Sequence, residues 1–222
     1  MKTRIVFLMT CLMLSVHAIN MSAQQVETQV KDIPYKLEVH NDPVNYTIAD
    51  NTIEITAKGK TNLFNNPNGK SNVSNAPMLL FEPNGDFTLS AKVTGQLSAI
   101  YDVAALVVYQ DEKTWTKFCY ENSVKKKPTI VSVVTREYSD DSNSVEAGKY
   151  AYMAIVKKGK EYSFFYSKNG KEWDMIRHFR LDTTGKVKLG FASHGWRGDG
   201  FTAKFSEIKY QDRALEDMRD PN

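Results

Sequence analysis

Four side chains of different chemistry alternate along one short stretch of the chain. Trp115, Lys117, Cys119 and Glu121 are each separated by a single residue. Alternate side chains of a β-strand point to the same side, so this spacing predicts that all four share one face of a sheet. An aromatic ring, a cation and a carboxylate on one sheet face are typical of a binding surface rather than of a plain apolar core.

Charged residues at the ends of the flanking runs extend this candidate site. Asp102 begins the preceding run, and Arg136 and Asp140 end the following one. Neighbouring strands lie about 5 Å apart, so we expect these positions to meet on the concave sheet. Charge on a sheet face is unfavourable unless it meets water, a partner or a ligand. The alternative is a network of salt bridges that satisfies itself and merely closes the sheet. The sequence predicts a single ligand-binding cluster of six residues: Asp102, Trp115, Lys117, Glu121, Arg136 and Asp140.

The other reactive residue types form no catalytic or metal-binding pattern. A nucleophilic cysteine needs a base and an orienting group, and Cys119 has no histidine pattern near it. The spacing of His40, His178 and His194 does not resemble that of metal ligands or of a catalytic triad. We expect Cys119 to be a buried, inert thiol, and we expect neither a metal nor a cofactor.

Runs with a period of two dominate the sequence and would position these residues. Phe87 to Val93 alternate cleanly between apolar and polar residues. Similar runs recur at roughly ten-residue spacing between turn signals, and helical periodicity is poor. One turn signal, Asn169-Gly170, supplies the positive φ angles of a tight hairpin. The pattern predicts an all-β sandwich or barrel. Of these we expect a single sandwich domain with two mainly antiparallel sheets.

Two segments interrupt these runs. Residues 60–77 are rich in asparagine, with Leu63 and Phe64 as apolar anchors. We expect a long loop there, either functional or simply packed on the surface. His194 to Gly200 form a glycine-rich loop, in which Trp196 is either an exposed stacking platform or a plug at one end of the sandwich.

The N-terminus has the layout of a secretory signal peptide. Lys2 and Arg4 precede an apolar run, and small residues precede Gln24. Cleavage after residue 23 would lower the formal net charge from +3 to +1, which argues against a nucleic-acid partner. It would also leave Cys119 as the one cysteine, so no internal disulfide could form. We expect export to the periplasm, the cell surface or the medium.

The rest of the chain divides simply. We expect the sandwich domain to occupy residues 24–211 and a polar tail, as a short helix or a frayed end, to occupy residues 212–222. No later segment is long and apolar enough to span a membrane.

Several motifs together resemble a known family. They are Tyr101-Asp102-x-Ala104-x-Leu106, Trp115-x-Lys117-x-x-x-Glu121, Val133-x-Thr135-Arg136-x-Tyr138-Ser139-Asp140 and Tyr166-Ser167-x-x-Gly170-x-x-Trp173. In this order they resemble domain-of-unknown-function family 1349, which includes the regulation-of-enolase protein and belongs to the concanavalin A-like lectin/glucanase superfamily. The resemblance implies a concanavalin A-like jelly roll. This chain departs from the family at Ala105, where glycine is usual, and at Asp141, where tryptophan often stands.

A fold of this kind hosts many functions, so the resemblance implies no reaction. Retaining hydrolases of the related fold usually carry Glu-x-Asp-x-Glu along one strand, and this chain has no such run. We therefore expect a secreted, non-catalytic carbohydrate-binding or accessory protein, of the Bacteroides envelope type. The alternatives are a glycoside hydrolase or lyase that uses Glu121 with Asp102 or Asp140, and a structural or protein-interaction domain of the cell envelope.

Overall fold

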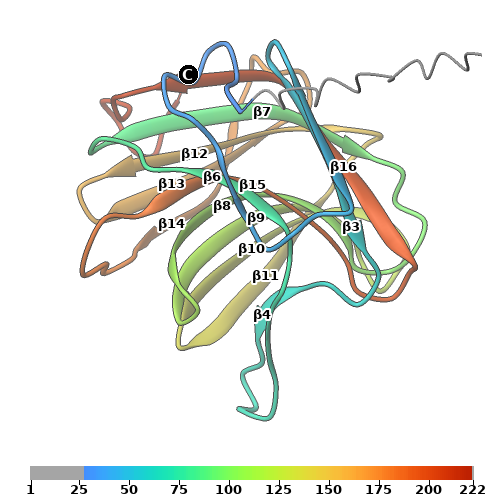
Figure 1. The fold of residues 1–222 in the computed structure, drawn as a ribbon. Coiled ribbons are helices and arrows are strands. Elements are labelled where there is room, and N and C mark those ends of the chain that lie inside the picture. Colours follow the sequence, from blue (N-terminus) through green and yellow to red (C-terminus); the bar gives the residue numbers. More distant parts are fainter. Residues whose placement is uncertain (1–27, 222) are drawn as a thin grey trace, which may run out of the picture.

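The computed structural model describes residues 28–221, and within them the chain is entirely β-structure and loops. The signal-peptide prediction therefore lies outside the described residues. Two seven-stranded antiparallel sheets face each other as a sandwich (Figure 1). In spatial order, sheet A contains β1 (Glu38–His40), β6 (Met78–Phe81), β15 (Lys188–Gly195), β8 (Asp102–Asp111), β9 (Thr114–Asn122), β10 (Pro128–Arg136) and β11 (Tyr138–Glu146).

Sheet B forms the second layer. In spatial order it contains β14 (Asp174–Arg180), β13 (Glu161–Ser167), β12 (Ala151–Lys158), β7 (Phe87–Gly95), β16 (Gly200–Gln211), β3 (Thr52–Lys58) and β2 (Asn45–Ala49). The order of strands in both sheets departs from their order in the chain, so distant segments become neighbours, as in a jelly roll. The predicted all-β, two-sheet sandwich is confirmed.

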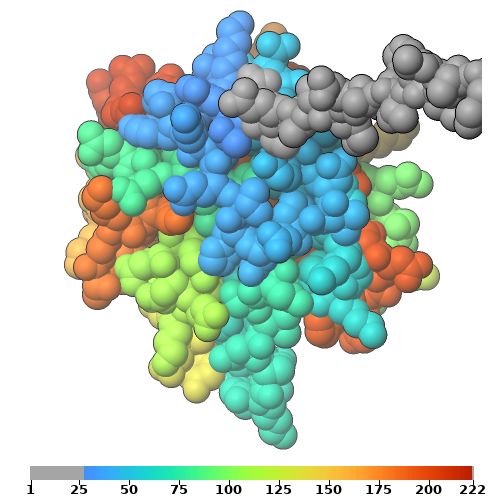
Figure 2. Space-filling view, viewed as in Figure 1, coloured from blue at the N-terminus to red at the C-terminus, as the bar shows by residue number. Residues whose placement is uncertain are grey.

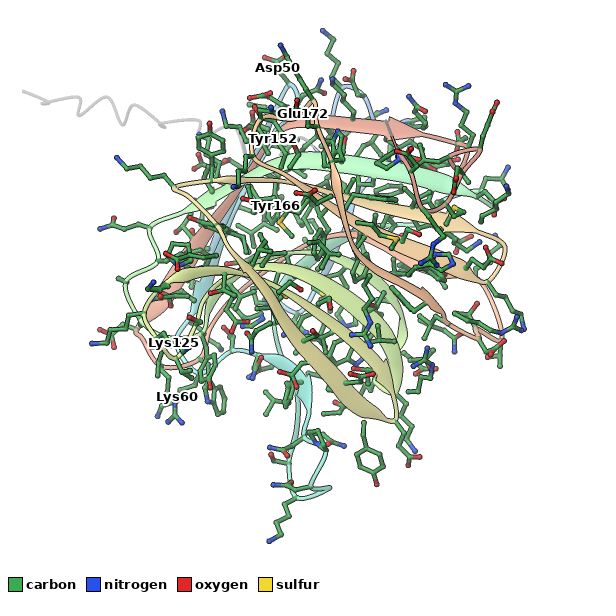
Figure 3. The ribbon with its side chains drawn as sticks, turned by 180° about the vertical axis from the view of Figure 1, so that it is seen from behind. Asp50, Lys60, Lys125, Tyr152, Tyr166 and Glu172 are labelled. Atoms are coloured by element: carbon green, nitrogen blue, oxygen red, sulfur yellow. The ribbon has the colours of Figure 1, made fainter. Side chains whose placement is uncertain are left out.

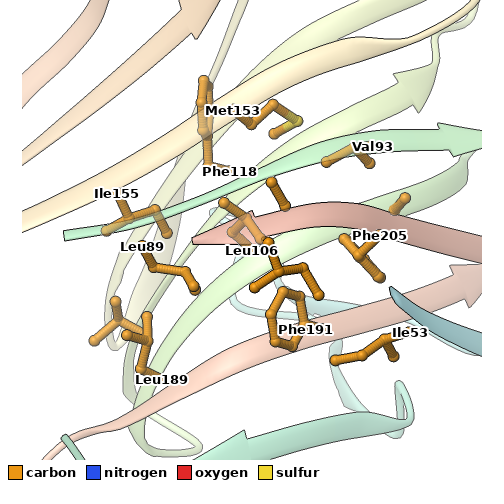
Figure 4. Close-up of a cluster of buried hydrophobic side chains, with 14 of the residues drawn as sticks. Ile53, Leu89, Val93, Leu106, Phe118, Met153, Ile155, Leu189, Phe191 and Phe205 are labelled. Carbon is orange, nitrogen blue, oxygen red and sulfur yellow. The ribbon is translucent and has the colours of Figure 1, made fainter. Parts of the chain in front are cut away.

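The main core lies between the two sheets. Leu106 and Phe118 of sheet A meet Leu89, Ile155 and Phe205 of sheet B, and all five are fully buried (Figure 4). The alternation that predicts β7 as a strand thus places its apolar side chains inward and its polar ones outward.

The outer face of sheet A is also buried, because a short hairpin covers it. Residues 60–77 are not a plain loop: they contain β4 (Leu63–Asn65) paired with β5 (Asn72–Ser74), and we call this hairpin the arm. Leu63 is fully buried in a second apolar cluster on this face. The tip of the arm stands out from the body of the protein (Figures 1 and 2). Sheet A is consequently apolar on both faces along much of its length.

The C-terminal segment packs on the outer face of sheet B instead of fraying or forming a helix. Met218 is buried with Phe165 and Val156, and its carbonyl accepts a hydrogen bond from the Ser163 hydroxyl. Among residues 28–221, no helix is long and apolar enough to cross a membrane.

Candidate functional site

The four alternating residues of β9 do share the outer face of sheet A, as their spacing predicts. Phe118, between them, lies in the core between the sheets, whereas Trp115 and Cys119 belong to the cluster beneath the arm. Lys117 lies between Val107 of β8 and Val133 of β10 in the strand register. The outer face is therefore the face of odd-numbered residues on β8, β9 and β10.

The prediction that Arg136 and Asp140 join this cluster is wrong, because both lie on the opposite face. Asp140 is paired in register with Val134, which faces the main core. Its carboxylate forms an ion pair of 2.8 Å with Arg177 of sheet B. Arg136 donates a hydrogen bond to the carbonyl of Arg180, also in sheet B. These two charges join the edges of the two sheets.

Asp102 is likewise placed on the other face, and its role is local. The carboxylate accepts hydrogen bonds from the backbone amides of Ser98 at 2.9 Å and Ala99 at 2.7 Å. It therefore fixes the turn that leads into β8. Tyr101, in this turn, has a φ angle of +64°, a conformation that non-glycine residues adopt rarely and that surrounding contacts must hold.

A pocket of about 290 Å³ opens over the outer face of sheet A. Its floor contains Lys117, Glu121, Val131, Val133 and His194, and its walls come from the arm, the Tyr101 turn, β11 and the loop after β15. The wall residues are mostly aromatic, polar or charged: Asn62, Phe64, Asn66, Ser71, Val73, Tyr101, Asp141, Trp196 and Arg197. Of the six predicted site residues, Lys117 and Glu121 line this pocket.

A buried Lys117–His194 contact defines one side of the floor. The Lys117 ammonium, on a side chain that is 3% exposed, lies 3.2 Å from Nε2 of His194. An ammonium can only donate, so Nε2 accepts and Nδ1 carries the imidazole proton. Burial, together with the nearby Lys117 charge, holds the pKa of His194 well below its ordinary value. His194 is therefore neutral, and its Nδ1 has no partner within residues 28–221.

Glu121 occupies the other side of the floor. Burial raises the pKa of its carboxyl to about 7, the Lys117 charge partly opposes this shift, and Asp141 reinforces it. In the described part of the chain no ion pair within 4.0 Å involves Glu121 or Lys117. Near neutral pH this carboxyl can therefore either donate or accept a hydrogen bond.

Trp115 and Cys119 support the pocket from below. Trp115 is fully buried, its Nε1 has no partner among the described residues, and its ring lies 6.0 Å from the Lys117 ammonium. Burial raises the pKa of the Cys119 thiol to about 12, which agrees with the expectation of an inert thiol. Within residues 28–221 no group of three or more His, Cys, Asp or Glu side chains is arranged to hold a metal ion.

Sequence reasoning missed several wall residues. Asp141, which follows the predicted Asp140 in the sequence, faces the pocket because it pairs in register with Val133, a residue of the outer face. Tyr101 lines the pocket and belongs to the family motif, but its spacing from the alternating residues does not predict a place in the site. Trp196 lines the pocket and is half-buried, so of the two expectations for it, a ring presented at a binding surface fits better than a plug.

Solved structures share this fold at low sequence identity. A functionally unknown protein from Saccharomyces cerevisiae has a TM-score of 0.75 at 21% identity, covering 82% of this chain and 97% of that one. The GH43 protein BlXynB from Bacillus licheniformis has a TM-score of 0.63 at 15% identity, covering 83% of this chain but 37% of that one. A Bacteroides ovatus protein described as "Xyloglucan PUL GH43B" has a TM-score of 0.62 at 14% identity, covering 85% and 38%.

These likenesses establish the fold alone, and the two GH43 proteins extend far beyond the matched part. No curated protein matches the chain. The family described as "Protein of unknown function (DUF1349)" matches residues 40–213, which include every strand except the start of β1. The chain therefore belongs to the DUF1349 family.

Proposed function

We propose that this protein binds carbohydrate without transforming it, through the pocket between the arm and the outer face of sheet A. The observation that carries the proposal is the lining of this pocket, where Tyr101, Phe64 and Trp196 surround Lys117 and Glu121. Ligand sites typically combine an apolar lining with a few polar groups. Sugars match that combination, because their rings present apolar faces and their hydroxyls both donate and accept hydrogen bonds.

The charges of the floor suit hydroxyl groups in particular. Charge-assisted hydrogen bonds are roughly twice as strong as neutral ones. Lys117 can donate to a sugar oxygen, and Glu121 can exchange hydrogen bonds in either direction near neutral pH. The fold likeness to GH43 proteins, one described with the word xyloglucan, guides the choice of test glycans and nothing more.

A glycan array probed with residues 24–222 tests this proposal. We expect selective binding that is lost on Trp196→Ala, because removal of an aromatic platform removes its contact area. Lys171→Ala, on the exposed turn after β13, is the matched control and should bind like the unaltered protein. An array without any signal would favour a structural or protein-interaction role in the cell envelope.

Glycoside hydrolysis is the second candidate, and the presence of the Glu121 and Asp141 carboxylates in one pocket favours it. Hydrolysis needs a protonated acid and an ionised base or nucleophile on either side of the scissile bond. Glu121, with its pKa raised to about 7, would be the acid, and Asp141 would be the second carboxylate in place of Asp102 or Asp140. Release of reducing ends from a polysaccharide panel, abolished in Glu121→Gln, would establish this activity and overturn the non-catalytic proposal.

Export is also part of the proposal, and its support is the layout of residues 1–23. Intact-mass measurement on protein recovered from the cell envelope or medium should give a chain that begins at Gln24. A full-length mass would mean an uncleaved anchor.

A further inference from the structure

The pocket continues into a second hollow on the same face of sheet A. This neighbouring cavity, of about 360 Å³, shares Tyr101, Glu121 and Asp141 with the pocket. Its other lining residues are polar or charged for the most part, and they come from the β9–β10 turn and the end of β11. Together the two cavities form one groove, with Glu121 and Asp141 at the junction.

From the inner pocket to the outer cavity the groove extends along β9. Lys117 lies in the inner pocket, Glu121 at the junction, and Ser123 and Lys125 in the outer cavity. The antiparallel β10 gives the reverse order, with Val133 in the inner pocket and Thr129 in the outer cavity. With a strand rise of about 3.3 Å per residue, the distance from Lys117 to Ser123 is roughly 20 Å. A groove of this length accommodates a short oligosaccharide rather than one sugar ring.

The arm closes the inner end of the groove. Beyond Lys117, β9 continues to Trp115, which is fully buried in a cluster with Leu63 of the arm. Asn65 fixes the arm in this position: its side-chain amide donates to the carbonyls of Glu112 at 2.8 Å and Glu137 at 3.0 Å. The backbone amide of Asn65 also donates to the Ser139 hydroxyl at 2.9 Å.

The junction is held by a constrained turn. Tyr101 keeps its positive φ angle while its amide donates to the carbonyl of Asn122 at 2.8 Å and its carbonyl accepts from Trp196 at 3.3 Å. The Asn122 side chain in turn donates to the Ala99 carbonyl at 2.9 Å. Strain held by surrounding contacts is a feature of ligand-binding positions, and here it places Tyr101 at both cavities.

We infer that the groove takes the end of a glycan chain. The terminal residue would lie in the inner pocket, against the arm, and the following residues would pass Tyr101 into the outer cavity. This inference rests on the proposed carbohydrate binding and adds which part of a glycan is recognised. An internal stretch of a long polymer would need a groove open at both ends.

Titration calorimetry with end-blocked oligosaccharides tests the inference. The probes are β-1,4-linked xylose, β-1,4-linked glucose and α-1,4-linked galacturonic acid series of one to six residues. Each is used free, blocked at the reducing end with 2-aminobenzamide, and blocked at the non-reducing end with a 4-O-methyl group. We expect affinity to rise up to about the trisaccharide and then stay constant, and one of the two blocks to abolish binding.

Variants separate the two cavities. Lys125→Ala/Asn143→Ala, in the outer cavity, should weaken trisaccharide binding by about fivefold or more, the effect of one lost hydrogen bond, and leave monosaccharide binding unchanged. Lys171→Ala is the control, because Lys171 is far from the groove. Its neighbour in the sequence, Glu172, lies on the side of sheet B, whereas Lys125 lies on the opposite side of the molecule (Figure 3).

The outcomes distinguish the two proposals. If both blocked forms bind as well as the free oligosaccharide, or if the outer-cavity variant binds the trisaccharide unchanged, the chain-end inference is overturned while carbohydrate binding stands. If no series binds and the glycan array is also silent, both proposals are overturned.

Discussion

Asp140 and Asp141 are consecutive residues of β11, yet they belong to different regions of the molecule. Asp140 reaches Arg177 across the gap between the sheets, whereas Asp141 faces the groove on the outer face of sheet A. At the sheet edge each charge meets a partner from sheet B. In the groove, Lys117 and Glu121 are more deeply buried and have no ion pair within the described chain.

This contrast separates the charges that join the two sheets from the groove charges that our proposal assigns to ligand binding. An exposed ion pair contributes little, about 0–1 kcal/mol. A buried charge without an ion partner is costly unless something else compensates it. The groove charges therefore make sense as a binding surface, and the following five variants test that distinction between the two regions.

The largest effect is expected for Trp115→Ala. Trp115 is fully buried beneath the arm, and truncating a buried large aromatic residue costs about 3–5 kcal/mol. Guanidinium chloride unfolding should show this loss of stability, with a smaller one in Trp115→Phe. A cost below about 1 kcal/mol would mean that the arm does not seal this end of the groove.

Glu121→Gln should change the pH dependence of stability. The folded-state pKa of about 7 exceeds the ordinary 4.5, so the folded protein holds this proton more tightly than the unfolded chain does. The free energy of unfolding of the unaltered protein should fall as pH rises between these values, by up to about 3 kcal/mol. Glu121→Gln lacks this fall. Its free energy of unfolding, relative to that of the unaltered protein, should therefore increase between pH 4.5 and pH values above 7. Parallel urea-unfolding profiles across this range would contradict a buried, raised-pKa carboxyl.

Asn65→Ala should release the arm at a cost of about 2 kcal/mol, because two side-chain hydrogen bonds are lost. Hydrogen exchange and limited proteolysis should then report faster opening at residues 66–71. Lys70→Ala, at the exposed tip, is the matched control. Equal exchange in both variants would mean that Asn65 does not hold the arm.

The smallest effects should come from the two neighbouring aspartates. Asp140→Asn should lower stability by less than about 1 kcal/mol and leave glycan binding unchanged. Asp141→Asn should leave stability unchanged and weaken binding. Calorimetry measures both quantities. If Asp140→Asn weakens glycan binding and Asp141→Asn lowers stability instead, the assignment of Asp140 to the contact between the sheets and of Asp141 to glycan binding is wrong.

Spacing within a single strand could be read from the sequence because it depends only on the backbone period. Trp115, Lys117, Cys119 and Glu121 share a face for that reason. The relation between strands could not be read in the same way, because a one-residue change of register exchanges the faces. The usual guide to register, alternation of apolar and polar residues, is absent from Ile130–Val134, because the arm covers part of the outer face and both faces of β10 are buried there.

The sequence by itself determined the fold class, the family and the shared face of Lys117 and Glu121, since these follow from local periodicity and an ordered set of motifs. Only the tertiary structure decided that Arg136 and Asp140 join the sheet edges, that Asp102 fixes the Tyr101 turn, and that residues 60–77 close a groove. Those features depend on strand register and on contacts between distant segments, such as Asn65 with Glu112 and Glu137. No local pattern specifies such long-range contacts, because they arise only when the two layers and the arm are assembled.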